Sequence, residues 1–284
     1  MDDNNYILPF QTINGYRYGR KLEFSNLIGN QNPVKRISKT EYVDLNGEVQ
    51  KYQQLAKNRS ESLESLVRTM KRLSRYIEHN FSGNKNELWI TLTYAENVTD
   101  SKRVYSDFKA FMKKLRRHYG HVEYISVLEP QKRWAWHIHA LFKSESDEYF
   151  YIANSHLAKL WKHGFVKVKK LKNSDNVAAY VTAYLTDLKH EDRKGSKKIE
   201  KGARLHLYPS GMNFYRMSRG IEKPEKIKST KYETFERFGM TNSAYAPDKI
   251  YYHDVDIGDG RKFLYKREFY NMKCEGDDDE SNSN

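Results

Sequence analysis

The alternation of side chains in residues 134–142 is the feature that most constrains the fold. The stretch reads Trp134-Ala135-Trp136-His137-Ile138-His139-Ala140-Leu141-Phe142. Successive side chains of a strand point to opposite faces, so His137 and His139 share one face of a predicted sheet. The other face, predicted to be the core, carries Trp136, Ile138, Ala140 and Phe142. A second strand-like run, Val122 to Glu129, precedes a short turn, and a connection of about five residues makes the two strands antiparallel neighbours.

The two histidines suggest a metal site at the end of this hairpin. Imidazoles roughly 6–7 Å apart on one rigid surface can share a metal ion. Glu129 lies near the turn on the neighbouring strand, within reach of both rings. A carboxylate with two imidazoles makes a mixed N/O site that leaves positions open for a substrate oxygen. The alternative is a pair of exposed or hydrogen-bonded strand histidines beside an exposed strand-end acid.

The pattern of elements indicates the fold class. Residues 60–188 read as helix, strand, helix, strand, strand, helix, strand, helix, with three-four apolar spacing in the helices and β-branched or aromatic runs in the strands. The tight hairpin excludes an all-parallel sheet. We therefore expect an α+β fold, with a mainly antiparallel central sheet and helices packed on its faces. Leu205 to Gly220 is expected to form a further strand pair.

Four segments are predicted along the chain. Residues 1–51 form an N-terminal β-rich appendage with a hairpin around Asn46-Gly47, and residues 52–222 form the main domain. Residues 223–274 form a C-terminal extension with a β-hairpin. Residues 275–284 form an acidic tail that is disordered by composition.

The charge of the chain points to a polyanionic partner. Without the last ten residues, which hold five acids and no base, 50 lysines and arginines face 32 acids, a net charge of +18. Nucleic acid fits this balance first and an anionic membrane second, while a merely soluble basic surface is the plain alternative. A basic strand and a basic loop are the predicted DNA contacts; they contain Lys167, Lys169 and Lys170, and Lys189, Arg193, Lys194, Lys197 and Lys198.

The remaining composition narrows the setting of the protein. Cys274 is the single cysteine, so no intrachain disulfide can form and a reducing cytosol is expected. No signal peptide and no apolar run of membrane-spanning length are visible, which predicts a soluble intracellular protein. No phosphate-binding Gly-x-x-x-x-Gly-Lys-Ser/Thr loop is present, so no fused helicase is expected.

Two tyrosines lie one turn apart on a predicted helix, Val177 to Leu188. Tyr180 and Tyr184 share one face of that helix. Tyrosines among apolar neighbours are often core residues. Beside a metal site, however, a pair of phenols is a candidate pair of nucleophiles.

Three motifs in order resemble those of the HUH endonuclease superfamily. Trp89-Ile90-Thr91-Leu92-Thr93-Tyr94 resembles the first motif, Trp136-His137-Ile138-His139-Ala140-Leu141-Phe142 with Glu129 upstream the second, and Ala179-Tyr180-Val181-Thr182-Ala183-Tyr184 the third. Leu160-Trp161-Lys162-His163-Gly164-Phe165-Val166 is also similar to this group. The chain resembles rolling-circle replication initiators over roughly residues 86–222, most of all those of gokushovirus-type microviruses and of bacterial plasmids and phages.

The resemblance implies a specific chemistry. It implies a ferredoxin-like palm, Mg²⁺ or Mn²⁺ held by His137, His139 and Glu129, and nicking of single-stranded origin DNA through a 5′-phosphotyrosine. Family members often place a lysine three or four residues after the tyrosine, where this chain has Ala183 and Tyr184. Either Tyr180 acts alone, or Tyr180 and Tyr184 alternate, with Tyr180 taken as the first nucleophile. The implied partners are a host helicase and polymerase in a bacterial cytoplasm, without a membrane.

Two other classes of function remain open from the sequence. A degenerate initiator would bind nucleic acid without catalysis. Two histidines and one carboxylate also describe a non-haem iron oxygenase, although that class explains neither the basic charge nor the tyrosine pair.

Overall fold

The chain forms two compact units. The computed structural model describes residues 6–26, 35–38, 40–44, 46–52, 57–58, 63–131, 134–146, 148–171, 205–209, 211–213, 215–240, 246–256 and 261–272. The first unit combines Met1–Leu55 with Pro224–Asn284, and the second is the continuous stretch Ala56–Lys223. The first unit is thus built from the two segments that flank the second in the sequence.

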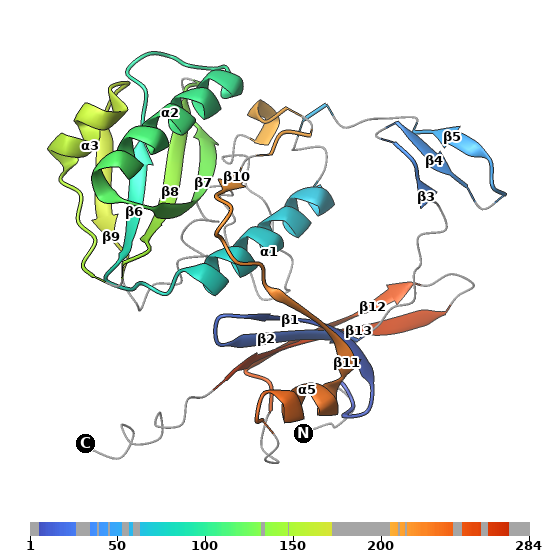
Figure 1. The fold of residues 1–284 in the computed structure, drawn as a ribbon. Coiled ribbons are helices and arrows are strands. Elements are labelled where there is room, and N and C mark those ends of the chain that lie inside the picture. The colour runs from blue at the N-terminus through green and yellow to red at the C-terminus, as the bar shows by residue number, and fades with distance from the viewer. Residues whose placement is uncertain are drawn as a thin grey trace, which may run out of the picture. The chain divides into compact units, whose positions relative to one another are not determined.

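The second unit is organised around a five-stranded antiparallel sheet (Figure 1). Its strand order is β10 (Tyr215–Met217), β7 (Val122–Pro130), β8 (Trp136–Ser144), β6 (Glu87–Leu92) and β9 (Val166–Lys170). All four pairings are antiparallel, including that of the predicted hairpin strands β7 and β8. The predicted α+β class with a mainly antiparallel sheet is confirmed.

Helix α2 (Ser101–Tyr119) packs on one face of this sheet. Its buried side chains are those predicted from the apolar spacing: Val104, Phe108, Phe111, Met112 and Leu115. The ring of Phe111 stacks 6.4 Å from that of Phe142, and the Phe108 ring meets the Tyr124 ring edge-on at 5.1 Å. Phe142 belongs to the predicted core face of β8, whose members Trp136, Ile138, Ala140 and Phe142 are all at most 4% exposed.

Helix α1 (Leu63–Asn80) packs on the opposite face, the one that also carries the histidines. Its buried stripe comprises Leu66, Met70, Leu73 and Ile77. Lys143, which shares the histidine face of β8, donates from Nζ to the carbonyl oxygen of Asn80 at 3.1 Å. The buried carboxylate of Glu87 accepts from the backbone N–H groups of Ser82, Gly83 and Asn84, which fixes the turn from α1 into β6.

The segment after helix α3 (Asn154–Trp161) docks onto the end of β6. Trp161 Nε1 donates to the carbonyl oxygen of Thr93 at 2.7 Å, and Ala95 N donates to the carbonyl oxygen of His163 at 2.8 Å. The sequence suggests that Gly164 ends the helix. Lys162, in the left-handed region with φ 64°, is instead the capping residue. Gly164 has another role, because a Cβ there would lie 2.6 Å from backbone atoms of Thr93 and Ala95.

Residues 205–220 differ from the expected strand pair. In the described residues, Leu205–Leu207 form a 3₁₀ turn and only Tyr215–Met217 form a strand, β10. This strand extends the sheet at the outer edge of β7, with Tyr215 opposite Val127. A long-range partner therefore takes the hydrogen bonds that a local hairpin would have used.

The first unit contains a second five-stranded sheet (Figure 1). Its strand order is β11 (Glu225–Thr230), β1 (Thr12–Tyr18), β2 (Lys21–Asn26), β13 (Lys262–Asn271) and β12 (Lys249–Asp256), and all pairs are antiparallel. The predicted C-terminal hairpin is present as β12 and β13. Helix α5 (Lys231–Arg237) covers one face, where Phe235 contacts the rings of Phe24 and Tyr270.

Buried charges tie both ends of the chain to this sheet. Glu268 is fully buried and accepts from the backbone N–H of Ile7, while Lys231 Nζ lies 2.9 Å from its Oε2 atom. Burial beside Glu268 raises the pKa of the Tyr270 hydroxyl, which donates to the same carboxylate. A buried carboxylate needs such partners, because an unpaired one is strongly destabilising.

A small sheet completes the described elements of the first unit. It consists of β3 (Lys35–Arg36), β4 (Glu41–Val43) and β5 (Val49–Lys51). The predicted hairpin around Asn46-Gly47 is the β4–β5 pair, in which Asp44 accepts from the N–H groups of Asn46 and Glu48. No helix in the described part of the chain has the length and apolar character needed to cross a membrane.

Substitutions in the α3–β9 loop should have opposite effects on stability. Gly164→Ala should lower the free energy of unfolding by about 1–3 kcal/mol, because the new methyl group meets fixed backbone. Lys162→Gly, in the same loop, should leave it unchanged or raise it by up to about 1 kcal/mol, because glycine tolerates positive φ. Urea unfolding of both variants measures the difference. Equal stability of Gly164→Ala and the unsubstituted protein would contradict the close backbone approach.

Candidate metal centre

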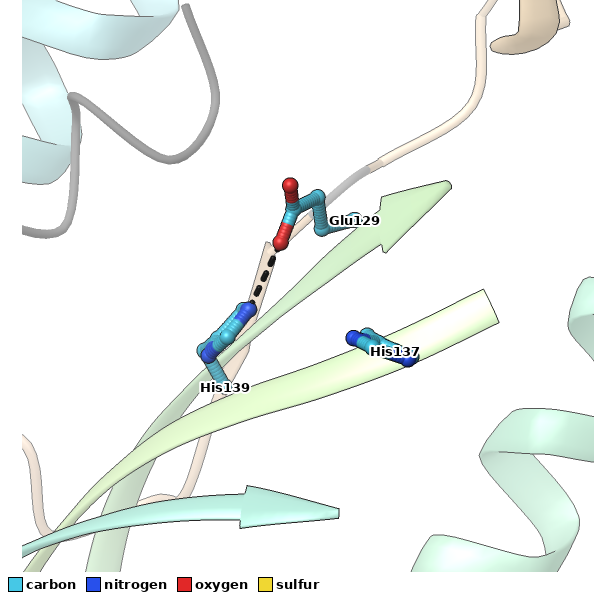
Figure 2. A group of neighbouring side chains, drawn as sticks. All are labelled: Glu129, His137 and His139. Atoms are coloured by element: carbon cyan, nitrogen blue, oxygen red, sulfur yellow. Dashed lines mark hydrogen bonds and ion pairs between the residues drawn. The ribbon is translucent and has the colours of Figure 1, made fainter. Parts of the chain in front are cut away.

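The β7–β8 hairpin brings together the three predicted ligands. Glu129 and His137 are directly paired across the two strands, and His139 follows two residues along β8 on the same face. Figure 2 shows the carboxylate of Glu129 turned toward His139, with His137 beside it on the same strand as His139. The predicted pairing of strands thus accounts for the cluster without any contribution from a loop.

The donor atoms are close enough for one ion after a small adjustment. His139 Nε2 lies 2.7 Å from Glu129 Oε2, and one ligand atom from each of Glu129, His137 and His139 lies within 4.8 Å of the others. Two donors that bind a metal ion at about 2.1 Å can be no further apart than about 4.2 Å. Slight side-chain rotation is therefore sufficient. In the described part of the chain this is the only group of three or more such residues with metal-binding spacing.

A second layer of contacts holds His139. Its Nδ1 atom lies 3.3 Å from Thr91 Oγ1, and Trp89 Nε1 donates to the same hydroxyl oxygen at 3.2 Å. The Trp89 ring also packs 5.4 Å from the imidazole. Because a hydroxyl can donate or accept, Thr91 suits either tautomer of His139. The sequence analysis missed this role, although the alternation along β6 puts Trp89 and Thr91 on the histidine face.

The lysines of β9 divide between the two faces of the sheet. Lys167 pairs with Thr91 and Lys169 with Trp89, so both project on the histidine face. Lys167 stands two strands from His139, about 10 Å away by strand spacing. Lys170 lies on the opposite face, where its Nζ atom is 4.2 Å from the centre of the Tyr149 ring. All three side chains belong to exposed residues.

The remaining predicted site residues lie outside the described residues. These are the tyrosines Tyr180 and Tyr184 and the loop residues Lys189, Arg193, Lys194, Lys197 and Lys198. Their roles stay predictions from the sequence.

The comparison with protein families gives a match over the same part of the chain. Residues 87–189, which begin at β6 and include the whole metal cluster, match the family described as replication-associated protein ORF2. A search of curated proteins and a search of solved structures gave no match.

The chain therefore contains a domain of this replication-associated protein family, consistent with a rolling-circle replication initiator. The resemblance stated from the three motifs is confirmed at this level. The closer likeness to gokushovirus-type initiators stays a prediction. A family of this kind implies binding of DNA at a replication origin.

Removal of a ligand should abolish binding of a divalent ion. We expect one Mn²⁺ per chain for the unsubstituted protein and loss of that site in His139→Ala, because two remaining donors hold a divalent ion weakly. Electron paramagnetic resonance of free Mn²⁺ measures the bound fraction directly, with no need for DNA.

His121→Ala is the matched control for this measurement. His121 also pairs with a carboxylate, 2.6 Å from Glu123, yet lies outside the three-residue cluster. Its substitution should leave Mn²⁺ binding unchanged. If both variants bind Mn²⁺ like the unsubstituted protein, the cluster is not the metal site.

Proposed function

We propose that this chain starts rolling-circle replication by nicking and rejoining single-stranded DNA at an origin. The observation that carries the proposal is the cluster of Glu129, His137 and His139 inside a replication-associated domain. Lys167 and Lys169 on the same face support it, because a phosphate chain needs cations beside the reacting group.

The donor set suits Mg²⁺ or Mn²⁺. A carboxylate oxygen is a hard ligand, and the two imidazoles favour Mn²⁺ over Mg²⁺. Such an ion, when bound, supplies Lewis-acid polarisation of the scissile phosphate and offsets the charge that develops on its oxygens. Thr91 orients His139 by accepting from Nδ1 when Nε2 is used as a ligand. Glu129 offsets the charge of the ion and fixes its position against β7.

The nucleophile in this proposal is Tyr180, with Tyr184 as its partner or alternate. The phenol loses its proton to water or a nearby base, and its oxygen forms a bond to phosphorus. The bond from phosphorus to the 3′-oxygen breaks, and that oxygen becomes a free 3′-hydroxyl after protonation. The 5′ end stays joined to the tyrosine. A later 3′-hydroxyl reverses the step and closes a circle, while the first one primes a polymerase.

The proposed setting follows from this reaction. The exposed 3′-hydroxyl requires a polymerase, and continued unwinding requires a helicase, which the host supplies. Bacterial cytoplasm, either of a plasmid-bearing cell or of a phage host, contains both. The proposal needs no membrane.

A covalent adduct tests the function directly. Full-length protein incubated with labelled single-stranded origin DNA and Mn²⁺ should yield a protein–DNA band on a denaturing gel. Tyr180→Phe should abolish the band, because phenylalanine has no oxygen to bond to phosphorus. Tyr184→Phe should retain the first adduct.

The other outcomes of this assay separate the alternatives. An adduct with Tyr180→Phe but not with Tyr184→Phe would assign the first attack to Tyr184. DNA binding by folded protein without any adduct would replace the proposal by a non-catalytic DNA-binding role.

The two faces of β9 provide a matched pair of lysine variants. Lys167→Gln should weaken the apparent affinity for the nicking substrate several-fold and lower its dependence on salt, because one phosphate contact is lost. Lys170→Gln removes the same charge from the opposite face and should have little effect. Initial rates of adduct formation over a range of DNA concentrations measure this. Equal losses in the two variants would contradict a phosphate contact at Lys167.

A further inference from the structure

The sheet of the first unit has one face that α5 does not cover. Contacts of α5 and of the N-terminal residues go to Phe24, Glu268 and Tyr270, which share one face by strand register. The opposite face includes two rows of paired residues that cross all five strands. The first row is Lys228, Asn14, Ser25, Arg267 and Tyr251. The second row is Lys226, Tyr16, Glu23, Phe269 and Lys249.

These two rows, called here the open face, are basic. They contain four cations and one acid, Glu23, which is 5% exposed and accepts from Arg267 at 2.8 Å. Arg267 and Glu23 therefore neutralise each other. The remaining cations of the two rows are Lys226, Lys228 and Lys249, all of which are exposed. The open face thus presents a net positive charge.

Aromatic rings lie between these cations. The Tyr251 ring, 46% exposed, meets the Phe269 ring edge-on at 5.9 Å. Lys249 Nζ lies 5.0 Å from the centre of the Tyr251 ring, and the Arg267 guanidinium lies 4.7 Å from that of Phe269. A sheet face that meets only water is normally polar. Exposed rings among cations instead provide stacking surfaces beside phosphate-binding charges.

We propose that the open face binds single-stranded nucleic acid, with bases stacked on Tyr251 and its neighbouring rings and phosphates held by Lys226, Lys228 and Lys249. Five strands span about 19 Å, wider than the roughly 12 Å major groove of B-DNA, so the face cannot enter a duplex groove. Rings on a flat surface reach bases only when these are unpaired. The choice of DNA over RNA rests on the proposed function, which produces a displaced single strand.

Strand β12 contains its own controls. Tyr251 projects on the open face, whereas its neighbour Tyr252, 54% exposed, projects on the opposite face, where it pairs with Lys266. Lys262 is likewise exposed and pairs with Asp256 on that opposite face. Substitutions of the same kind on the two faces therefore differ only in which side of the sheet they change.

Fluorescence anisotropy of full-length protein with a labelled single-stranded DNA tests the proposal. EDTA is present, so that only binding is measured. Tyr251→Ala should weaken binding on the order of tenfold, and Tyr251→Phe should restore it, because the ring does the stacking. Lys226→Gln, Lys228→Gln and Lys249→Gln combined should reduce the slope of log affinity against log salt by about 2. Tyr252→Ala and Lys262→Gln should bind like the unsubstituted protein.

Three results would overturn the proposal. They are unchanged binding in the Tyr251→Ala and triple-lysine variants, equal losses in the variants of the opposite face, and an equal loss with a duplex of the same sequence. The adduct assay is independent of this outcome. Loss of the adduct with intact face-specific binding rejects the proposed function alone, and an adduct without face-specific binding rejects only the open face.

Discussion

The register of the β7–β8 hairpin is the constraint on which the metal cluster depends. It sets Glu129 opposite His137 and aligns His139 with Thr91 on the next strand. A slip by one residue would turn both histidines to the other face of the sheet. Residues that never touch the cluster prevent this. Trp136, Ile138 and Phe142 are buried on the far side, and each stabilises the correct register by about 1.5–3 kcal/mol.

The sheet of the second unit separates stability from chemistry by its two faces. The face under α2 is apolar and closed. The other face is covered by α1 over part of its area and carries His137, His139 and Lys167 over the rest. A rigid sheet therefore holds the ligands in place, and Trp89 and Thr91 supply the hydrogen bonds that orient one of them. Such support is what a site needs if its geometry is to persist before a substrate arrives.

Local patterns predicted much of this arrangement, and long-range pairing explains the rest. Alternation in residues 134–142 and the apolar spacing of α2 were sufficient for the sheet, its antiparallel order and the Glu129–His137–His139 cluster. The pairing of β2 with β13 could not be predicted, because no local signal encodes a partner more than two hundred residues away. The same limit explains β10, whose partner Val127 lies far from residues 205–220. Thr91 was missed because its role depends on a neighbouring strand.

The first unit imposes an order on the folding of the nascent chain. Its central strand β2 is made early during synthesis, but its neighbour β13 leaves the ribosome only after the whole replication-associated domain. Ile7 must likewise wait for Glu268. The second unit, continuous in sequence, can fold while the chain is still growing, whereas the first closes late over a large loop. Until then β1 and β2 expose unpaired edges, so the nascent chain is most vulnerable to aggregation at its beginning.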